Sequence, residues 1–118
     1  MGDDLRQYSA GSTVRLTTTG RTSGRQHTVT IWFVVLDANR CYVQHVRGRA
    51  HWYKNALKTP DVQVDFGAGP RPGRLTPIDD PLEIKRVLAL FRRKYLMAWL
   101  VQLLGIRQQP VAAVIECQ

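Results

Sequence analysis

Short segments rich in β-branched and apolar residues recur along the whole chain. This pattern is typical of a small domain built mainly from β-strands. The predicted strands are Val14 to Thr19, His27 to Asp37, Arg40 to Val46, Val62 to Phe66, Arg74 to Ile78 and Pro110 to Glu116. Two helical segments interrupt them, so the predicted order is β-β-β-α-β-β-α-β. The sequence contains no βαβ repeat of the dinucleotide-binding type. Six short strands with two helices can close into a small barrel, so the sequence predicts a mainly β (α+β) fold.

The connections between the predicted strands are short and rich in turn residues. Gly20 to Arg25 and Asp37 to Asn39 join the first three strands, which predicts an antiparallel meander. Ile31 to Leu36 is apolar at every position, so both faces of that segment are expected to be covered. Gly67 to Gly73 holds three glycines and two prolines and is predicted as a loop. Pro77 has no backbone donor, so the strand that contains it is placed at a sheet edge.

Two segments have the residue spacing of helices. Ala50 to Lys58 carries apolar residues one turn apart, and Pro60 prevents that helix from continuing. The second helix is predicted to begin at Asp80 as its cap, with Pro81 at the first helical position. Its apolar stripe is predicted from Ile84, Val87, Leu88, Phe91 and Tyr95, with Arg86, Arg92, Arg93 and Lys94 outside the stripe.

The length of 118 residues fits one domain. Residues 12–118 are predicted to form it, whereas residues 1–11 are polar without periodicity and are predicted to be a flexible lead-in. Asp3 and Asp4 stand where a secretory signal has basic residues, and the longest apolar run, Leu96 to Leu104, is too short to span a bilayer. These features predict a cytoplasmic protein. Both cysteines lie in strand-like segments and are predicted to be buried free thiols, and no metal site is predicted.

The chain is strongly basic, with 17 lysine and arginine residues against 9 aspartate and glutamate residues and a net charge of +8. Such a surface attracts anions, and the excess of arginine over lysine favours recognition of phosphate. One alternative is a basic module that binds nucleic acid or an acidic membrane surface, because Arg92, Arg93 and Lys94 precede the apolar run Leu96 to Leu104. The basic residues are scattered and no nucleic-acid motif is present, so nucleic acid is not the expected partner. Peripheral contact with a membrane is compatible with both interpretations.

The turn from Gly20 to His27 is the first candidate site. Its glycines allow backbone amides to approach a ligand closely, and its side chains add hydroxyl donors and positive charge. This composition suits a phosphate cradle. It is equally that of an ordinary solvated hairpin turn, and the two interpretations stay open at this point.

The segment from Gln44 to Tyr53 is the second candidate site, because it leaves a strand and enters a helix whose N-terminus attracts anions. Trp52 and Tyr53 can stack on a flat ring or pack as core aromatics. His45 and His51 can act as acid–base groups or as structural residues.

Two stretches resemble the deazaflavin-dependent nitroreductase family. Leu16 to Arg25 has the sequence L-T-T-T-G-R-T-S-G-R, and Trp52 to Val64 has the sequence W-Y-K-N-A-L-K-T-P-D-V-Q-V. In that family a T-T-G-R-x-[ST]-G turn is followed by two strands, a W-Y-x-N-L helix and N-P-x-V-x-V. The matched order runs from Val14 to Phe66, and two motifs in register are more specific than either alone.

The resemblance implies a six-stranded antiparallel split β-barrel related to flavin-binding, pyridoxamine-phosphate-oxidase-like proteins. It also implies an oxidoreductase that uses reduced coenzyme F-420, a deazaflavin with a phosphate and an oligoglutamate tail. Such a protein transfers hydride to a flat small-molecule acceptor such as a quinone or a nitroaromatic, and the redox chemistry belongs to the cofactor, so no catalytic side chain is obligatory. A homodimer is expected by analogy with related barrels.

Carried over by position, the resemblance implies several groups of contacts. The turn that meets the phosphate and tail corresponds to Arg21, Thr22, Ser23, Gly24, Arg25 and His27. The strand under the ring corresponds to Thr30, Ile31 and Trp32, and the end of the third strand to His45, Val46 and Arg47. The helix aromatics are Trp52 and Tyr53, and the acceptor side is expected at Tyr95 and Trp99, which can alternatively pack as a core pair. The alternative cofactors are FMN and haem held by a histidine. A further alternative is that the domain is a non-catalytic carrier.

Overall fold

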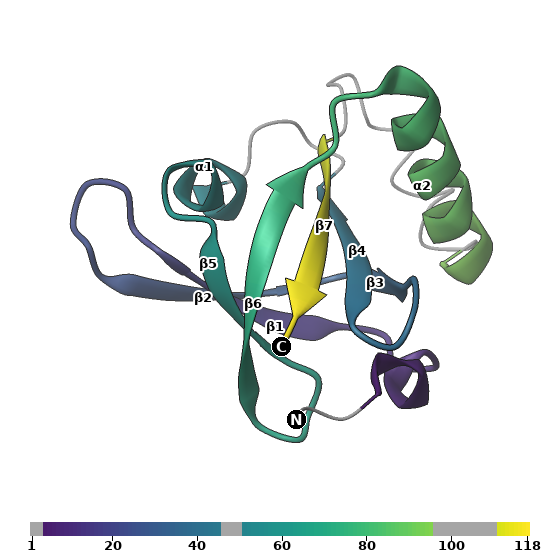
Figure 1. The fold of residues 1–118 in the computed structure, drawn as a ribbon, viewed down its shortest axis with the longest axis horizontal. Helices are drawn as coiled ribbons and strands as arrows, with labels where there is room; N and C mark the ends of the chain where they lie inside the picture. The colour runs from purple at the N-terminus through teal and green to yellow at the C-terminus, as the bar shows by residue number, and fades with distance from the viewer. Residues whose placement is uncertain (1–3, 46–50, 96–110) are drawn as a thin grey trace.

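The computed structural model describes residues 4–45, 51–95 and 111–118 (Figure 1). These residues form one antiparallel sheet of seven strands, two α-helices and a short 3-10 helix. The elements are η1 (Leu5–Tyr8), β1 (Val14–Thr19), β2 (Gln26–Ile31), β3 (Phe33–Val35), β4 (Arg40–His45), α1 (His51–Lys58), β5 (Asp61–Asp65), β6 (Pro70–Pro77), α2 (Pro81–Lys94) and β7 (Val111–Cys117). The fold is mainly β with two helices, as predicted, but the described strands number seven and not six.

The sheet curls because its two outermost strands are consecutive in the chain. The strand order is β2-β1-β5-β6-β7-β4-β3, and Trp32 alone separates β2 from β3. The two ends of the sheet must therefore approach each other at this residue. A curled antiparallel sheet of this kind fits the split barrel that the resemblance implies.

The prediction of a single strand from His27 to Asp37 is wrong. Its first half, β2, pairs with β1 from Val14↔Ile31 to Thr19↔Gln26, and its second half, β3, pairs with β4. The two halves lie at opposite ends of the sheet order, so the first strands form a bent ribbon and not a flat meander. Local apolar content predicts extended backbone, but the bend depends on the twist and closure of the whole sheet.

The principal core cluster joins the sheet to α1. Along β1 the side chains of Val14, Leu16 and Thr18 are buried, and Leu16 pairs with Val64 of β5. Trp52 and Ala56 of α1 belong to the same cluster. The two cysteines, Cys41 and Cys117, are buried and free, as predicted.

Strand β6 lies between β5 and β7, so its predicted place at a sheet edge is wrong, and Pro70 to Gly73 belongs to the strand and not to the predicted loop. In the register of the sheet, Pro70 and Pro72 are paired with β5 only and Pro77 with β7 only, and the Pro72 carbonyl also accepts from the Gln118 amide at 3.0 Å. The prolines are tolerated because each has a paired residue in one neighbouring strand only. Gly73 is paired with both β5 and β7, and a Cβ atom there would lie 2.9 Å from Cγ2 of Ile115.

Helix α2 begins as predicted, with Oδ1 of Asp80 accepting from the Leu82 amide at 3.1 Å. Its buried residues Val87 and Phe91 form a second cluster on the sheet. Lys94, however, does not lie outside the apolar stripe. Its Nζ donates to the Phe33 carbonyl at 2.9 Å and lies 3.8 Å from the centre of the Phe33 ring. No helix in the described residues is long and apolar enough to cross a membrane.

The predicted lead-in is described from residue 4 onward. Leu5, in η1, is fully buried, and its amide donates to the Ala38 carbonyl at 2.8 Å. The ring of Tyr8 stacks on Phe66 with 5.1 Å between centroids. This part of the chain therefore contacts the body of the domain through both side chains.

Candidate functional site

The turn between β1 and β2 is closed by its own backbone. The Gly20 amide donates to the Arg25 carbonyl at 2.7 Å, and the Gly24 amide donates to the Gly20 carbonyl at 3.0 Å. Gly24 has a φ of +71°, a conformation that favours glycine. Oγ of Ser23 accepts from the Arg25 amide at 3.1 Å, which leaves its hydroxyl hydrogen available to another partner.

Gly20 is the most crowded point of this turn. A Cβ atom there would lie 2.8 Å from Oγ of Ser23, 2.9 Å from Nε2 of His27 and 3.1 Å from the Arg25 carbonyl oxygen. Glycine therefore lets the side chains of Ser23 and His27 fold over the backbone.

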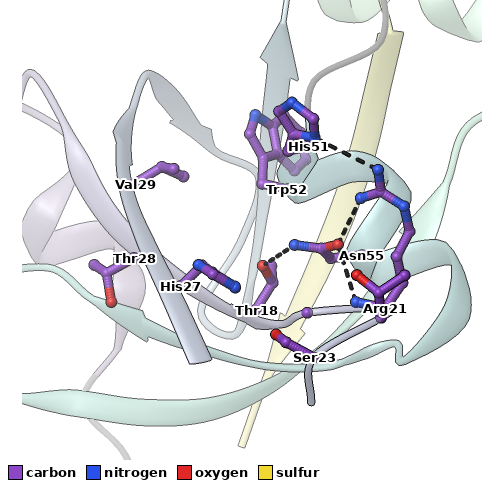
Figure 2. A pocket seen from close by; sticks show the side chains of 11 residues that line it. Thr18, Arg21, Ser23, His27, Thr28, Val29, His51, Trp52 and Asn55 are labelled. Carbon is purple, nitrogen blue, oxygen red and sulfur yellow. Dashed lines mark hydrogen bonds between the residues drawn. The ribbon is translucent and has the colours of Figure 1, made fainter. Parts of the chain in front are cut away.

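A pocket of about 540 Å³ lies between this turn and α1 (Figure 2). It is lined by Thr18, Gly20, Arg21, Thr22, Ser23, His27, Thr28, Val29, His51, Trp52 and Asn55. One arginine and two histidines are among these described lining residues, and no carboxylate is. The electrostatic character of the pocket consequently favours an anion.

Arg21 forms the wall that faces α1, as Figure 2 shows. Its Nη1 donates to Oδ1 of Asn55 at 2.8 Å, and its Nη2 lies 3.5 Å from Nδ1 of His51. Nζ of Lys58 donates to the Arg21 carbonyl at 2.6 Å. None of these partners is a carboxylate, so the positive charge of Arg21 is not compensated by them.

Asn55 is a lining residue that sequence reasoning missed. It is buried on α1, and its Nδ2 donates to Oγ1 of the buried Thr18 at 3.4 Å. A signal for it was present, because His51 and Asn55 are four residues apart and therefore share one face of the predicted helix. Nothing in the sequence indicated that this face meets the turn after β1.

The two helix aromatics have different environments. Trp52 lines the pocket and is buried, and its Nε1 is buried without a hydrogen-bond partner in the described part of the chain. Tyr53 is half-buried and packs edge-on against Trp52, with 5.8 Å between ring centroids. Burial raises the pKa of Tyr53, so its hydroxyl stays protonated at neutral pH.

Of the residues predicted for the turn, the structure brings together Arg21, Thr22, Ser23 and His27 at the pocket. Gly24, Arg25, Thr30, Ile31 and Tyr53 are not among its described lining residues. Val46, Arg47 and Trp99 lie outside the described residues, and His45 is the last residue of β4.

Trp32 and Tyr95 stack on each other away from this pocket, with 4.4 Å between centroids and 4° between planes. Oη of Tyr95 lies 2.7 Å from the Ser12 carbonyl oxygen and 2.9 Å from that of Phe33. Burial raises the pKa of Tyr95 above its ordinary value. Trp32 is thus the stacking partner of Tyr95 in the described residues, whereas a pair of Tyr95 with Trp99 stays a prediction because Trp99 lies outside them.

A family model described as an uncharacterized protein conserved in bacteria (DUF2255) matches residues 4–114. The chain belongs to this family. No curated protein matches the sequence. Solved structures support the resemblance to deazaflavin-dependent nitroreductases at the level of the fold, and membership of that family stays a prediction.

Three solved structures illustrate the range of proteins that share the fold of this DUF2255 member. An F420-H2 dependent reductase (FDR-A) is 23% identical, with a TM-score of 0.66 over 90% of this chain and 95% of that one. A Listeria innocua protein provisionally assigned as a pyridoxamine 5'-phosphate oxidase is 13% identical, with a TM-score of 0.68 over 97% and 90%. HutZ, the haem storage protein from Vibrio cholerae, is 14% identical, with a TM-score of 0.70 over 97% and 87%. At these identities the comparisons establish the fold alone.

Proposed function

We propose that the protein is an oxidoreductase that binds a reduced deazaflavin, coenzyme F-420, with an anionic part of the cofactor in the pocket between the β1–β2 turn and α1. Hydride transfer to a flat acceptor such as a quinone or a nitroaromatic is the proposed reaction. The F420-H2 dependent reductase among the structures of the same fold supports this choice of cofactor.

The observation that carries the proposal is the convergence of Arg21, from the turn, with His51 and Trp52, from α1, on one pocket. The turn alone has the composition of a solvated hairpin. Together with α1 it has a cationic wall, hydroxyl donors and a large aromatic side chain, which is the combination that a ring with an anionic substituent requires.

The residues present fit such a group. Arg21 offers its guanidinium to an anionic oxygen, and the hydroxyls of Thr22 and Ser23 add neutral donors. Trp52 adds an aromatic side chain to the same lining.

When bound, the deazaflavin supplies the hydride, and the acceptor takes up one proton for each hydride. In this proposal Arg21 binds and orients the anionic part of the cofactor. Trp52 and Val29 provide apolar surface that excludes water from the bound ring. The proton comes from solvent, so no side chain has to donate it.

The test is a fluorescence titration of the purified protein with oxidised coenzyme F-420, with parallel absorbance titrations with FMN and with haem. The wild type is expected to bind the deazaflavin, and Arg21→Ala to bind it about tenfold more weakly, because a charge-assisted hydrogen bond is lost. Arg86→Ala, which removes an equal charge from an exposed position on α2, is the matched control and should retain wild-type affinity.

Binding of FMN or haem in place of the deazaflavin would assign another cofactor to the same fold and overturn the proposed one. Equal loss of affinity in the Arg21 and Arg86 variants would show that only overall charge matters. Failure of the wild type to bind any of the three would refute a cofactor-dependent function.

A further inference from the structure

We propose that Asn55 is a positioning residue, which holds the guanidinium of Arg21 in the pocket wall so that it meets the anionic part of the ligand with its charge uncompensated. This inference rests on the proposed function, because it assigns Asn55 a role in binding the same ligand. Asn55 itself acts through Arg21 and not on the reacting atoms.

The guanidinium and the backbone amide of Arg21 both donate hydrogen bonds to one atom of Asn55. Oδ1 of Asn55 accepts from Nη1 of Arg21 at 2.8 Å and from the Arg21 backbone amide at 3.3 Å. An amide oxygen has two lone pairs and can accept both bonds. The long arginine side chain is therefore folded back onto its own backbone around a single acceptor.

The side-chain amide of Asn55 is in turn held by a hydrogen bond to the buried Thr18. Asn55 is 5% exposed and Thr18 is 1% exposed, and the bond from Nδ2 of Asn55 to Oγ1 of Thr18 spans 3.4 Å. Arg21 determines which side of the amide it meets, because its guanidinium and backbone amide can only donate and therefore require the oxygen, which leaves the nitrogen of Asn55 to donate to the Thr18 hydroxyl. A buried acceptor with a fixed orientation reduces the entropy that Arg21 loses when a ligand binds.

A neutral acceptor also differs from a charged one in its effect on the ligand. A carboxylate at position 55 would hold Arg21 equally well but would form an ion pair with it and repel an anion. The asparagine amide positions the guanidinium and leaves its positive charge for the ligand. Figure 2 shows this arrangement, with Asn55 between Thr18 and Arg21 and hydrogen bonds to both.

The experiment has one arm without ligand and one with inorganic pyrophosphate as the probe. In the first, ¹⁵N relaxation of the Arg21 Nε–H group is measured in the wild type, Asn55→Ala and Asn55→Asp. The side chain should be ordered in the wild type and in Asn55→Asp, and mobile in Asn55→Ala. A mobile Arg21 in the wild type overturns the inference whatever the ligand.

In the second arm, pyrophosphate affinity is measured for the wild type, Asn55→Ala, Arg21→Ala and the double variant. Asn55→Ala should bind several-fold more weakly than the wild type, but it should cause no further loss in the Arg21→Ala background. A further loss there would show that Asn55 acts on the ligand directly or through general destabilisation, and would overturn the inference.

Asn55→Asp distinguishes positioning from a merely structural role, and it remains informative if Asn55→Ala fails to fold. It should melt nearer to the wild type than Asn55→Ala, yet bind pyrophosphate about tenfold more weakly than the wild type, because its charge cancels that of Arg21. If affinity instead follows melting temperature across both variants, Asn55 is structural. An ordered Arg21 in a wild type that binds neither pyrophosphate nor coenzyme F-420 removes the proposed function, and the ligand role of Asn55 with it.

Discussion

Nη1 of Arg21 lies 2.8 Å from Oδ1 of Asn55, although 34 positions separate the two residues in the chain. This contact joins the turn after β1 to the buried face of α1. Because of this contact, the hairpin turn forms one wall of a pocket and is not wholly exposed to solvent. The proposed cofactor site depends on the same contact, since the arginine and the aromatic side chain come from different elements.

Gly20→Ala should distort the tip of the β1–β2 hairpin. The new Cβ would lie 3.1 Å from the Arg25 carbonyl oxygen and closer still to the side chains of Ser23 and His27. We expect a loss of about 1 kcal/mol in the free energy of unfolding, as for other overpacked sites, together with weaker binding in the pocket. Urea denaturation and a coenzyme F-420 titration measure the two effects.

The control for this variant is Gly69→Ala, at a distant turn. Gly69 has a φ of +102° and no atom within 4 Å of an added Cβ, so alanine there adds backbone strain without crowding. It should lose stability and keep wild-type affinity. Wild-type affinity in Gly20→Ala would contradict the role of Gly20 in shaping the pocket.

Asp37→Asn should lose a small, pH-dependent stabilisation. The Arg40 guanidinium, which donates through Nε to Oδ2 of Asp37 at 2.8 Å, lowers the pKa of Asp37 in the folded state. The contribution is therefore fully present above about pH 3.9, the value for an unfolded chain, and is lost as the pH falls through the lowered pKa. Because the pair is exposed to solvent, its loss at pH 7 should cost only about 0.5 kcal/mol.

Denaturation of the wild type and Asp37→Asn at pH 7 and at about pH 2.5 tests this sign, since the pKa of an unfolded aspartate lies well above the lower pH. The difference in unfolding free energy should shrink at the lower pH. A difference that grows as the pH falls would contradict the assigned pKa direction.

The thiol of Cys41 should be unreactive in the folded protein. Cys41 is fully buried, and burial raises the pKa of its thiol, which keeps the thiolate population negligible at pH 8. Reaction with a thiol-specific reagent such as DTNB is expected only after unfolding in denaturant. Rapid labelling of Cys41 in native buffer, identified by mass spectrometry, would show that β4 opens readily.

Tyr95→Phe should reduce stability and leave cofactor affinity unchanged. The variant keeps the ring that stacks on Trp32 but removes a hydroxyl whose oxygen lies 2.7 Å from the Ser12 carbonyl oxygen. The expected loss is about 1 kcal/mol, the value of one intramolecular hydrogen bond. Thermal melting and the coenzyme F-420 titration together check this. A weaker cofactor complex with unchanged stability would favour the alternative placement of Tyr95 at the ligand.

The sequence by itself determined features that depend on neighbouring residues. Asp80 and Pro81 specify the start of α2, because a side-chain cap and a residue without an amide hydrogen suit the first helical turn. In β5 the alternation of Val62 and Val64 with polar residues likewise matches which side chains are buried. The turn from Gly20 to His27 and the segment from Gln44 to Tyr53 were both recognisable as separate candidate sites.

Only the tertiary structure decided how these segments meet. The bend at Trp32, the interior position of β6 and the place of Lys94 over Phe33 all depend on residues distant in the chain. The pairing of Arg21 with Asn55 has the same origin, because the curl of the sheet and the packing of α1 against β1 bring the two together. Local sequence sets backbone preference and the pattern of burial, whereas the choice of distant partners follows from closing the whole sheet around one core.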